Sequence, residues 1–166
     1  SRLGPGGVID AKVGRQFAEG DDVARSLRAQ GRLGQVVIVH LGTNGPPRAS
    51  DIDSLMRELD GVPRVLLVNV RMPRKWEGAT NAALQDATHR YPKTVLVDWH
   101  GHSNSHPDWF QSDGVHLTRR GADAFAALIA ESLPPPPPPP PPTTTTEPPP
   151  PPPPESTTTT APIPVG

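Results

Sequence analysis

Three short apolar runs stand out along the chain, at positions 36–41, 64–70 and 94–98. Each is rich in β-branched residues and lacks the alternation of apolar and polar positions that marks a strand with one face in water. The pattern therefore predicts strands that are covered on both faces, as in a parallel sheet. A weaker run at 8–13 predicts one more strand near the start of the chain.

The segments between these runs carry apolar residues at helical spacing. The predicted helices cover 21–32, 50–59, 76–90 and 118–132. Strands that alternate with helices predict a parallel sheet with helices on both faces, because right-handed crossovers place them there. We therefore expect an α/β fold, a three-layer α/β/α sandwich of the flavodoxin-like kind. In such sheets ligands bind at the carboxyl ends of the strands.

The end of the chain has a different composition. Segment 134–166 holds 18 of the 25 prolines and two runs of four threonines. It has almost nothing to bury, so it cannot offset the entropy lost on ordering. We interpret it as a Pro/Thr-rich low-complexity tail, either a semi-rigid polyproline stalk or a terminus without a role. The foldable part is then one domain, 1–133.

Charge and composition exclude several classes of function. The net charge is −1, and the tail holds two acids and no base, so the domain alone is at about +1. No basic stripe supports nucleic-acid binding. The absence of cysteine excludes disulfides, thiolate metal ligands and a cysteine nucleophile. The apolar runs are shorter than the roughly 20 residues of a membrane-spanning helix, so we expect no transmembrane segment.

Candidate chemistry follows the strands. Asn44, in Leu-Gly-Thr-Asn-Gly at 41–45, can aim its side-chain amide at a developing oxyanion. Gly14, after the weak first strand, can offer a backbone N–H to the same oxyanion. Either segment taken alone is more typical of a plain turn.

An acid–base pair is the third candidate. In Asp113-Gly-Val-His116 the carboxylate can accept a hydrogen bond from the imidazole Nδ1, which fixes the tautomer and leaves Nε2 free as a base. Alone, the pair fits an exposed loop equally well. Taken together, the three segments predict an oxyanion hole beside a general base.

These motifs carry a resemblance. The words at 13–16, 40–45 and 113–117 resemble the second, third and fifth blocks of the SGNH/GDSL hydrolase superfamily. The segments at 68–71, 97–100 and 106–110 resemble one branch of this superfamily. That branch is the extracytoplasmic domain of membrane acyltransferases similar to peptidoglycan O-acetyltransferases. The resemblance covers roughly residues 7–133.

The resemblance implies a Ser-His-Asp mechanism. His116 matches the base, Asp113 its orienting acid, and Asn44 and Gly14 the oxyanion hole. The implied reaction is transfer of an acyl group, most simply acetyl, from an ester donor to a cell-envelope glycan, outside the membrane and without a metal or organic cofactor. A fused or associated membrane acyltransferase domain is the implied partner. A carbohydrate or lipid esterase is the alternative within the same chemistry.

The family's nucleophile is missing. The chain contains no Gly-Asp-Ser block, and Ser1 lies only 13 residues before Gly14, too close for a helical crossover between two strands. We therefore expect a domain that lacks its first, central strand and is weakly stable and catalytically silent alone. The explanations are a fragment of a longer protein or, in another class of function, a non-catalytic surface module on a Pro-rich stalk.

Other polar and aromatic residues are candidates for lining the substrate. They are Arg15, Gln16, Asn69, Arg71 and Trp109. The histidines at 100, 102 and 106 match no zinc signature, so we interpret them as a solvated loop. Asp98, at the end of a strand, is expected to hold a loop in place.

Overall fold

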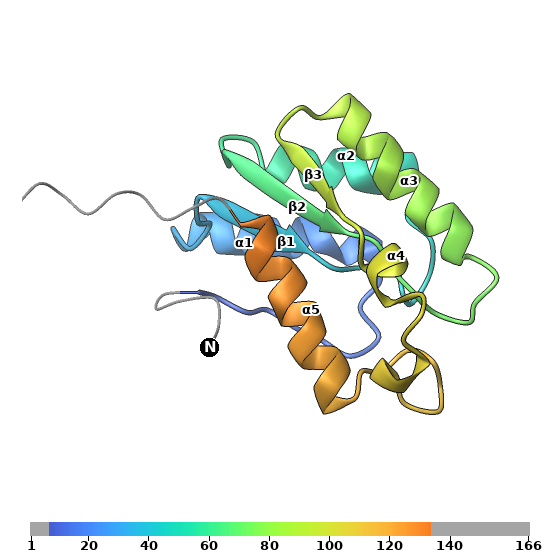
Figure 1. Ribbon diagram of the computed structural model, residues 1–166. Coiled ribbons are helices and arrows are strands. Elements are labelled where there is room, and N and C mark those ends of the chain that lie inside the picture. Colours follow the sequence, from blue (N-terminus) through green and yellow to red (C-terminus); the bar gives the residue numbers. More distant parts are fainter. Residues whose placement is uncertain (1–6, 134–166) are drawn as a thin grey trace, which may run out of the picture. The chain divides into compact units, whose positions relative to one another are not determined.

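A three-stranded parallel sheet forms the centre of the computed structural model, which describes residues 7–133 (Figure 1). The strands are β1 (Val36–Val39), β2 (Arg64–Val68) and β3 (Thr94–Val97), in the order β1-β2-β3. The three strong apolar runs are thus confirmed as strands. Each strand ends one or two residues before its run does, where the chain turns into the loops that follow the sheet.

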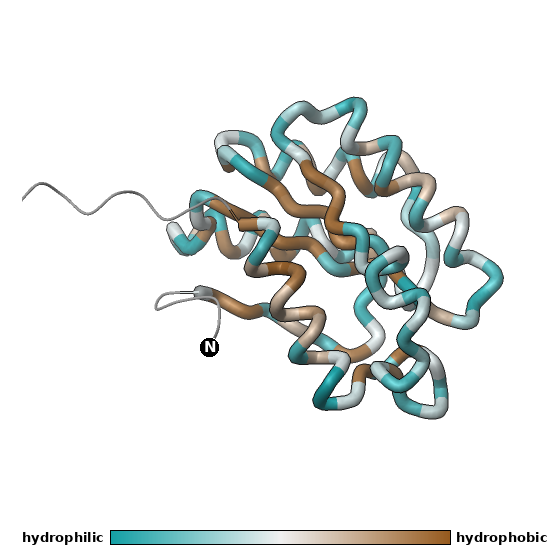
Figure 2. Tube along the Cα trace, viewed as in Figure 1, coloured by the Kyte–Doolittle hydropathy of each residue, from teal (hydrophilic) through white to brown (hydrophobic). Residues whose placement is uncertain are grey.

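Two hydrophobic cores lie on opposite faces of this sheet. Along β2, Val65 and Leu67 pack into one core, and Leu66 and Val68 pack into the other. All four side chains have no exposed surface, which explains the unbroken apolar run. In Figure 2 the strands accordingly form a continuous hydrophobic band between the helices.

Helices cover both faces and complete the three layers. The first core also holds side chains from α1 (Gly20–Ala29), α2 (Ala49–Glu58) and α3 (Glu77–Arg90). The second is closed by α5 (Arg119–Ser132). This is the predicted α/β/α sandwich. No helix among residues 7–133 is long and apolar enough to cross a membrane.

The prediction of a strand at 8–13 was wrong. The segment has no regular structure, and its apolar side chains are exposed, Val13 by 99%. Its polar side chains instead make local ion pairs, Arg15 with Asp10 at 2.6 Å and Lys12 with Glu19 at 2.8 Å. Within the described residues no strand pairs with the outer edge of β1, the edge where the resemblance puts the family's first strand.

Three short elements were not predicted. They are the 3-10 turns η1 (Phe17–Glu19) and η2 (Pro107–Trp109) and the helix α4 (Trp99–Ser103). The carboxylate of Asp98 accepts a hydrogen bond from the Gly101 N–H and so caps α4. Asp98 holds a loop in place, as expected. Ser1 and the tail 134–166 lie outside the described residues.

Candidate active site

The Asp113–His116 pair is joined as the spacing predicts. His116 Nδ1 lies 2.5 Å from Asp113 Oδ2, while Asp113 Oδ1 accepts hydrogen bonds from the backbone N–H groups of Val115 (2.9 Å) and His116 (3.0 Å). One carboxylate oxygen thus holds the turn and the other faces the ring. The hydrogen bond from the His116 ring, followed by the two backbone hydrogen bonds, holds the pKa of Asp113 well below its usual range.

The Nε2 side of the ring remains accessible. The His116 side chain is 73% exposed and that of Asp113 42%. No serine hydroxyl among residues 7–133 is hydrogen-bonded to the ring. With Nδ1–H donated to Asp113, Nε2 is the nitrogen left to accept a proton.

A narrow turn of the chain, residues 110–117, presents this pair. Gln111 N–H donates to the His116 carbonyl at 2.7 Å, and Phe110 and Leu117 form an antiparallel bridge. Gly114 at the tip has φ +68°, a left-handed conformation that costs glycine little. We call residues 110–117 the catalytic turn. Directly after it, Thr118 caps α5 by accepting from Gly121 N–H, so the turn is fixed to a helix of the second core.

The oxyanion candidates lie together in a second pair of loops. Asn44 follows β1, and its Nδ2 donates to the carbonyl of Arg15 at 3.2 Å. Arg15 directly follows Gly14, so the side-chain amide and the glycine of the predicted hole are neighbours. No hydrogen bond among residues 7–133 joins these loops to the catalytic turn, so the structure brings the four predicted residues together as two separate pairs.

The sequence of this chain is similar to those of known O-acetyltransferases. The chain is 39% identical over 126 residues to the "Putative peptidoglycan O-acetyltransferase YrhL" of Bacillus subtilis and 35% identical over 130 residues to the O-acetyltransferase OatA of Staphylococcus aureus. The matches cover 76% and 78% of this chain but 20% and 21% of those proteins, so the chain spans about a fifth of their length. No family model matches.

Two solved structures share the fold. One is the C-terminal catalytic domain of peptidoglycan O-acetyltransferase A of Streptococcus pneumoniae, with a TM-score of 0.63 and 23% identity over 78% of this chain and 80% of that one. The other is a lipase/acylhydrolase of Enterococcus faecalis, with a TM-score of 0.59 and 14% identity over 72% and 70%. The chain belongs to the SGNH/GDSL superfamily. In sequence the chain is similar to O-acetyltransferases over about three quarters of its length.

The other candidate residues of this SGNH domain are mostly occupied by structural contacts. Asn69 is buried, and its amide donates to Asp98 at 2.7 Å and accepts from the His100 N–H at 2.7 Å. Arg71 lies over the Phe110 ring, 5.0 Å from its centre, and donates to the Asn104 carbonyl at 3.4 Å. These contacts leave Asn69 little surface for a substrate.

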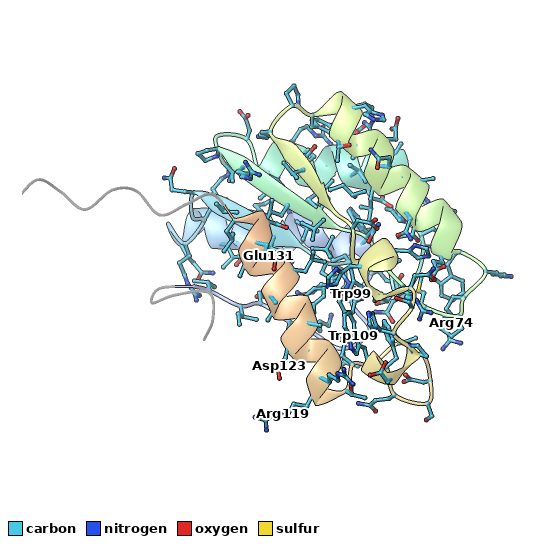
Figure 3. The ribbon with its side chains drawn as sticks, in the orientation of Figure 1. Arg74, Trp99, Trp109, Arg119, Asp123 and Glu131 are labelled. Atoms are coloured by element: carbon cyan, nitrogen blue, oxygen red, sulfur yellow. The ribbon has the colours of Figure 1, made fainter. Side chains whose placement is uncertain are left out.

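Trp109 belongs to an aromatic stack behind the catalytic turn. It is 9% exposed and lies between Trp99, at 5.7 Å, and His106, whose ring is parallel to it at 3.9 Å. Figure 3 shows Trp99 and Trp109 side by side between α4 and α5. The prediction of a solvated loop for the three histidines was wrong in part: His100 and His102 lie in the helix α4, and His100 and His106 are half-buried. No group of three metal-ligating side chains lies among residues 7–133.

Arg15 and Gln16 sit beside the oxyanion loops. Arg15 pairs with Asp10, and Gln16 lines a shallow hollow with Phe17 and Arg48. Both are therefore placed near Asn44 but are not joined to the catalytic turn. No sequence motif pointed to Pro73 or Glu77. Pro73 lies against Gly114 of the catalytic turn, and Glu77 lies 3.2 Å from His100 of α4. In both cases the two partners are far apart in the chain.

Proposed function

We propose that this SGNH domain supplies the acid–base pair and oxyanion donors of an acyltransferase that moves an acetyl group to a hydroxyl of a cell-envelope glycan. The contact between His116 Nδ1 and Asp113 Oδ2, which leaves Nε2 open, carries the proposal. The sequence similarity to O-acetyltransferases supports the class of acyl group and acceptor.

The chemistry requires a serine in addition, because this chain has no Gly-Asp-Ser block. The serine oxygen attacks the acyl carbonyl carbon while His116 Nε2 takes its proton. The bond to the donor alcohol then breaks, and the imidazolium returns the proton to that alcohol. The acceptor hydroxyl then loses its proton to His116 and attacks the acyl-enzyme carbonyl. The bond between the serine oxygen and the acyl carbon breaks, and the imidazolium returns the proton to the serine oxygen. Asp113 stabilises the imidazolium in both halves.

Asn44 is suited to the oxyanion role in one specific respect. A side-chain amide has two N–H donors, and one of them is held by the Arg15 carbonyl at 3.2 Å. That hydrogen bond fixes the amide plane and leaves the second N–H for the developing negative charge. The Gly14 N–H would be the second donor.

Water is a competing acceptor. The 73% exposure of His116 lets water reach the base, which favours some ester hydrolysis in place of transfer. An esterase is therefore the second candidate function. The ratio of transfer to hydrolysis with a glycan present separates the two.

The setting of the reaction belongs to the same proposal. The matching region is about a fifth of each relative. We propose that the domain works outside the membrane beside a membrane acyltransferase domain, fused or associated, that delivers the acyl donor.

The test supplies the serine. The chain is joined behind a strand and helix bearing Gly-Asp-Ser and assayed with p-nitrophenyl acetate, with and without a chito-oligosaccharide. We expect the chain alone to be silent and the joined protein to turn over. His116→Ala should lower kcat/KM by about 10⁴-fold or more.

His89→Ala, which changes an exposed histidine on α3, is the control and should have no effect. A folded joined protein without turnover would contradict the proposal and favour the non-catalytic module. Turnover that survives His116→Ala would contradict the role of His116 as the base.

A further inference from the structure

The segment that follows β2 touches the catalytic turn at two points. Arg71 lies over the ring of Phe110, at the base of the turn. At the tip, a methyl group added to Gly114 would lie 3.0 Å from two carbon atoms of the Pro73 ring, so the glycine and the proline are in close contact. Residues 71–73 thus lie beneath the turn from its base to its tip.

The residue between these two contacts is held by a carboxylate. The Met72 N–H donates to Glu77 Oε2 at 2.5 Å, and Met72 itself is only 3% exposed. The other oxygen, Glu77 Oε1, lies 3.2 Å from His100 Nε2. Glu77 therefore joins the 71–73 segment to α4, which follows the neighbouring strand.

The far side of this connection is also fixed. His100 donates its backbone N–H to Asn69 Oδ1, and Asn69 Nδ2 donates to Asp98, the cap of α4. The side-chain amide of Asn81 pairs with both backbone groups of Val70, at 2.8 Å each. The loops after β2 and β3 are thus tied to each other by side chains, and the catalytic turn rests on one of them.

We propose that Glu77 is a positioning residue for the acid–base pair: by holding Met72 it fixes Arg71 and Pro73 against the catalytic turn and so sets the alignment of Asp113 with His116. Glu77 touches neither residue of the pair and acts through the 71–73 segment. The proposal deepens the proposed function and rests on it for its catalytic meaning, whereas the geometry it claims can be measured without turnover.

The experiment uses the full 166-residue chain labelled with ¹³C and ¹⁵N. Two signals report on the pair: the titration of the Asp113 carboxyl carbon with pH, and the share of His116 rings that carry their proton on Nδ1. Glu77→Ala should raise the titration midpoint of Asp113 by about 0.5 to 1 pH unit, toward the ordinary value, and lower the Nδ1–H share.

Two variants separate positioning from a loss of stability. Glu77→Gln keeps an oxygen that accepts from Met72 N–H, so both signals should stay close to those of the wild type. Glu58→Ala removes another half-buried carboxylate, one that accepts from Arg25 Nε at 3.0 Å on the α1–α2 face, and should leave both signals unchanged.

The proposal is overturned if folded Glu77→Ala leaves both signals unmoved, or if Glu58→Ala moves them as far. Should Glu77→Ala not fold, Pro73→Ala decides, since it removes the ring contact and keeps the carboxylate; a shift in the same direction supports the proposal, and no shift overturns it. Because no substrate is involved, an inactive joined enzyme would end the proposed function and leave this result standing.

Discussion

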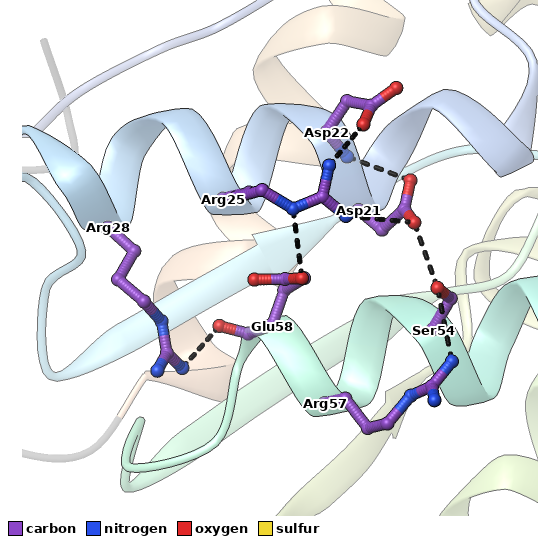
Figure 4. Close-up of polar contacts among 7 residues, drawn as sticks. All are labelled: Asp21, Asp22, Arg25, Arg28, Ser54, Arg57 and Glu58. Atoms are coloured by element: carbon purple, nitrogen blue, oxygen red, sulfur yellow. Dashed lines mark hydrogen bonds and ion pairs between the residues drawn. The ribbon is translucent and has the colours of Figure 1, made fainter.

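Two regions of the molecule build exposed ion pairs from carboxylates, with different chemical results. On the α1–α2 face, Arg25 contacts Asp22 at 2.5 Å, Glu58 at 3.0 Å and Asp21 at 3.5 Å (Figure 4). A guanidinium stays charged at every physiological pH, so Arg25 is a permanent partner for these carboxylates and cannot act as a base.

In the catalytic turn the partner is an imidazole. One oxygen of Asp113 accepts hydrogen bonds from the backbone, and the other accepts from the ring of His116, whose second nitrogen faces solvent. The comparison teaches that the number of charge contacts is a poor guide to chemistry. What distinguishes the turn is a partner with one nitrogen held by the carboxylate and a second nitrogen left to act as a base.

The largest expected effect comes from the tip of the turn. Gly114→Ala places a side chain at φ +68° and brings its methyl group to 3.0 Å from Pro73, so we expect a loss of about 2 kcal/mol or more in the free energy of unfolding. Gly61, just after α2, has φ +83° with open space around it, so Gly61→Ala should lose only about 1 kcal/mol.

Urea unfolding measures both variants. Equal losses in the free energy of unfolding at the two glycines would mean that Pro73 moves aside at little cost. The Pro73–Gly114 contact would then be too weak to support the proposed role of the 71–73 segment.

An intermediate effect is expected from acid. Because the pKa of Asp113 is lower in the folded chain than in the unfolded chain, its contribution to stability is fully present above a pH of about 4 and is lost as the pH falls below that value. Asp113→Asn should therefore show a flatter loss of stability than the wild type between about pH 4 and 2. Urea unfolding at several pH values gives the free energy of unfolding of both proteins as a function of pH. If the two curves ran parallel, the turn would not stabilise the ionised Asp113 carboxylate.

The smallest effect is expected on the α1–α2 face. Arg25 is 53% exposed, and water and salt screen its ion pairs. Arg25→Ala should lower the Tm by no more than about 2 °C, with a smaller effect in high salt. Thermal melts at two salt concentrations test this. A large decrease in Tm that does not depend on salt would show that the Arg25 ion pairs stabilise the fold more than their exposure predicts.

The parts of the fold that were predictable depend on local patterns. Val65 to Val68 are all apolar because the sheet is covered on both faces. Four consecutive residues are enough to reveal this pattern. Segment 8–13 has a weaker pattern, interrupted by Asp10 and Lys12, and has no pairing partner among the described residues. Whether such a segment becomes a strand depends on what lies beside it, which its own residues do not encode.

The same division holds in the site. Asp113 and His116 are three residues apart, so their contact could be predicted from spacing alone. Pro73 meets Gly114, and Glu77 meets His100, across long stretches of chain. No periodicity or motif links such residues, and only the packing of the loops after β2 and β3 brings them together.

Gly121 has a consequence for motion. A methyl group at this position, in the first turn of α5, would lie 2.1 Å from the Trp109 carbonyl oxygen, so the helix sits directly on the backbone that enters the catalytic turn. Thr118 N–H donates to the same carbonyl at 2.9 Å. The start of α5 and the residue before the catalytic turn therefore share one carbonyl oxygen, so any tilt of the helix axis would have to shift the backbone at both ends of the turn that carries His116.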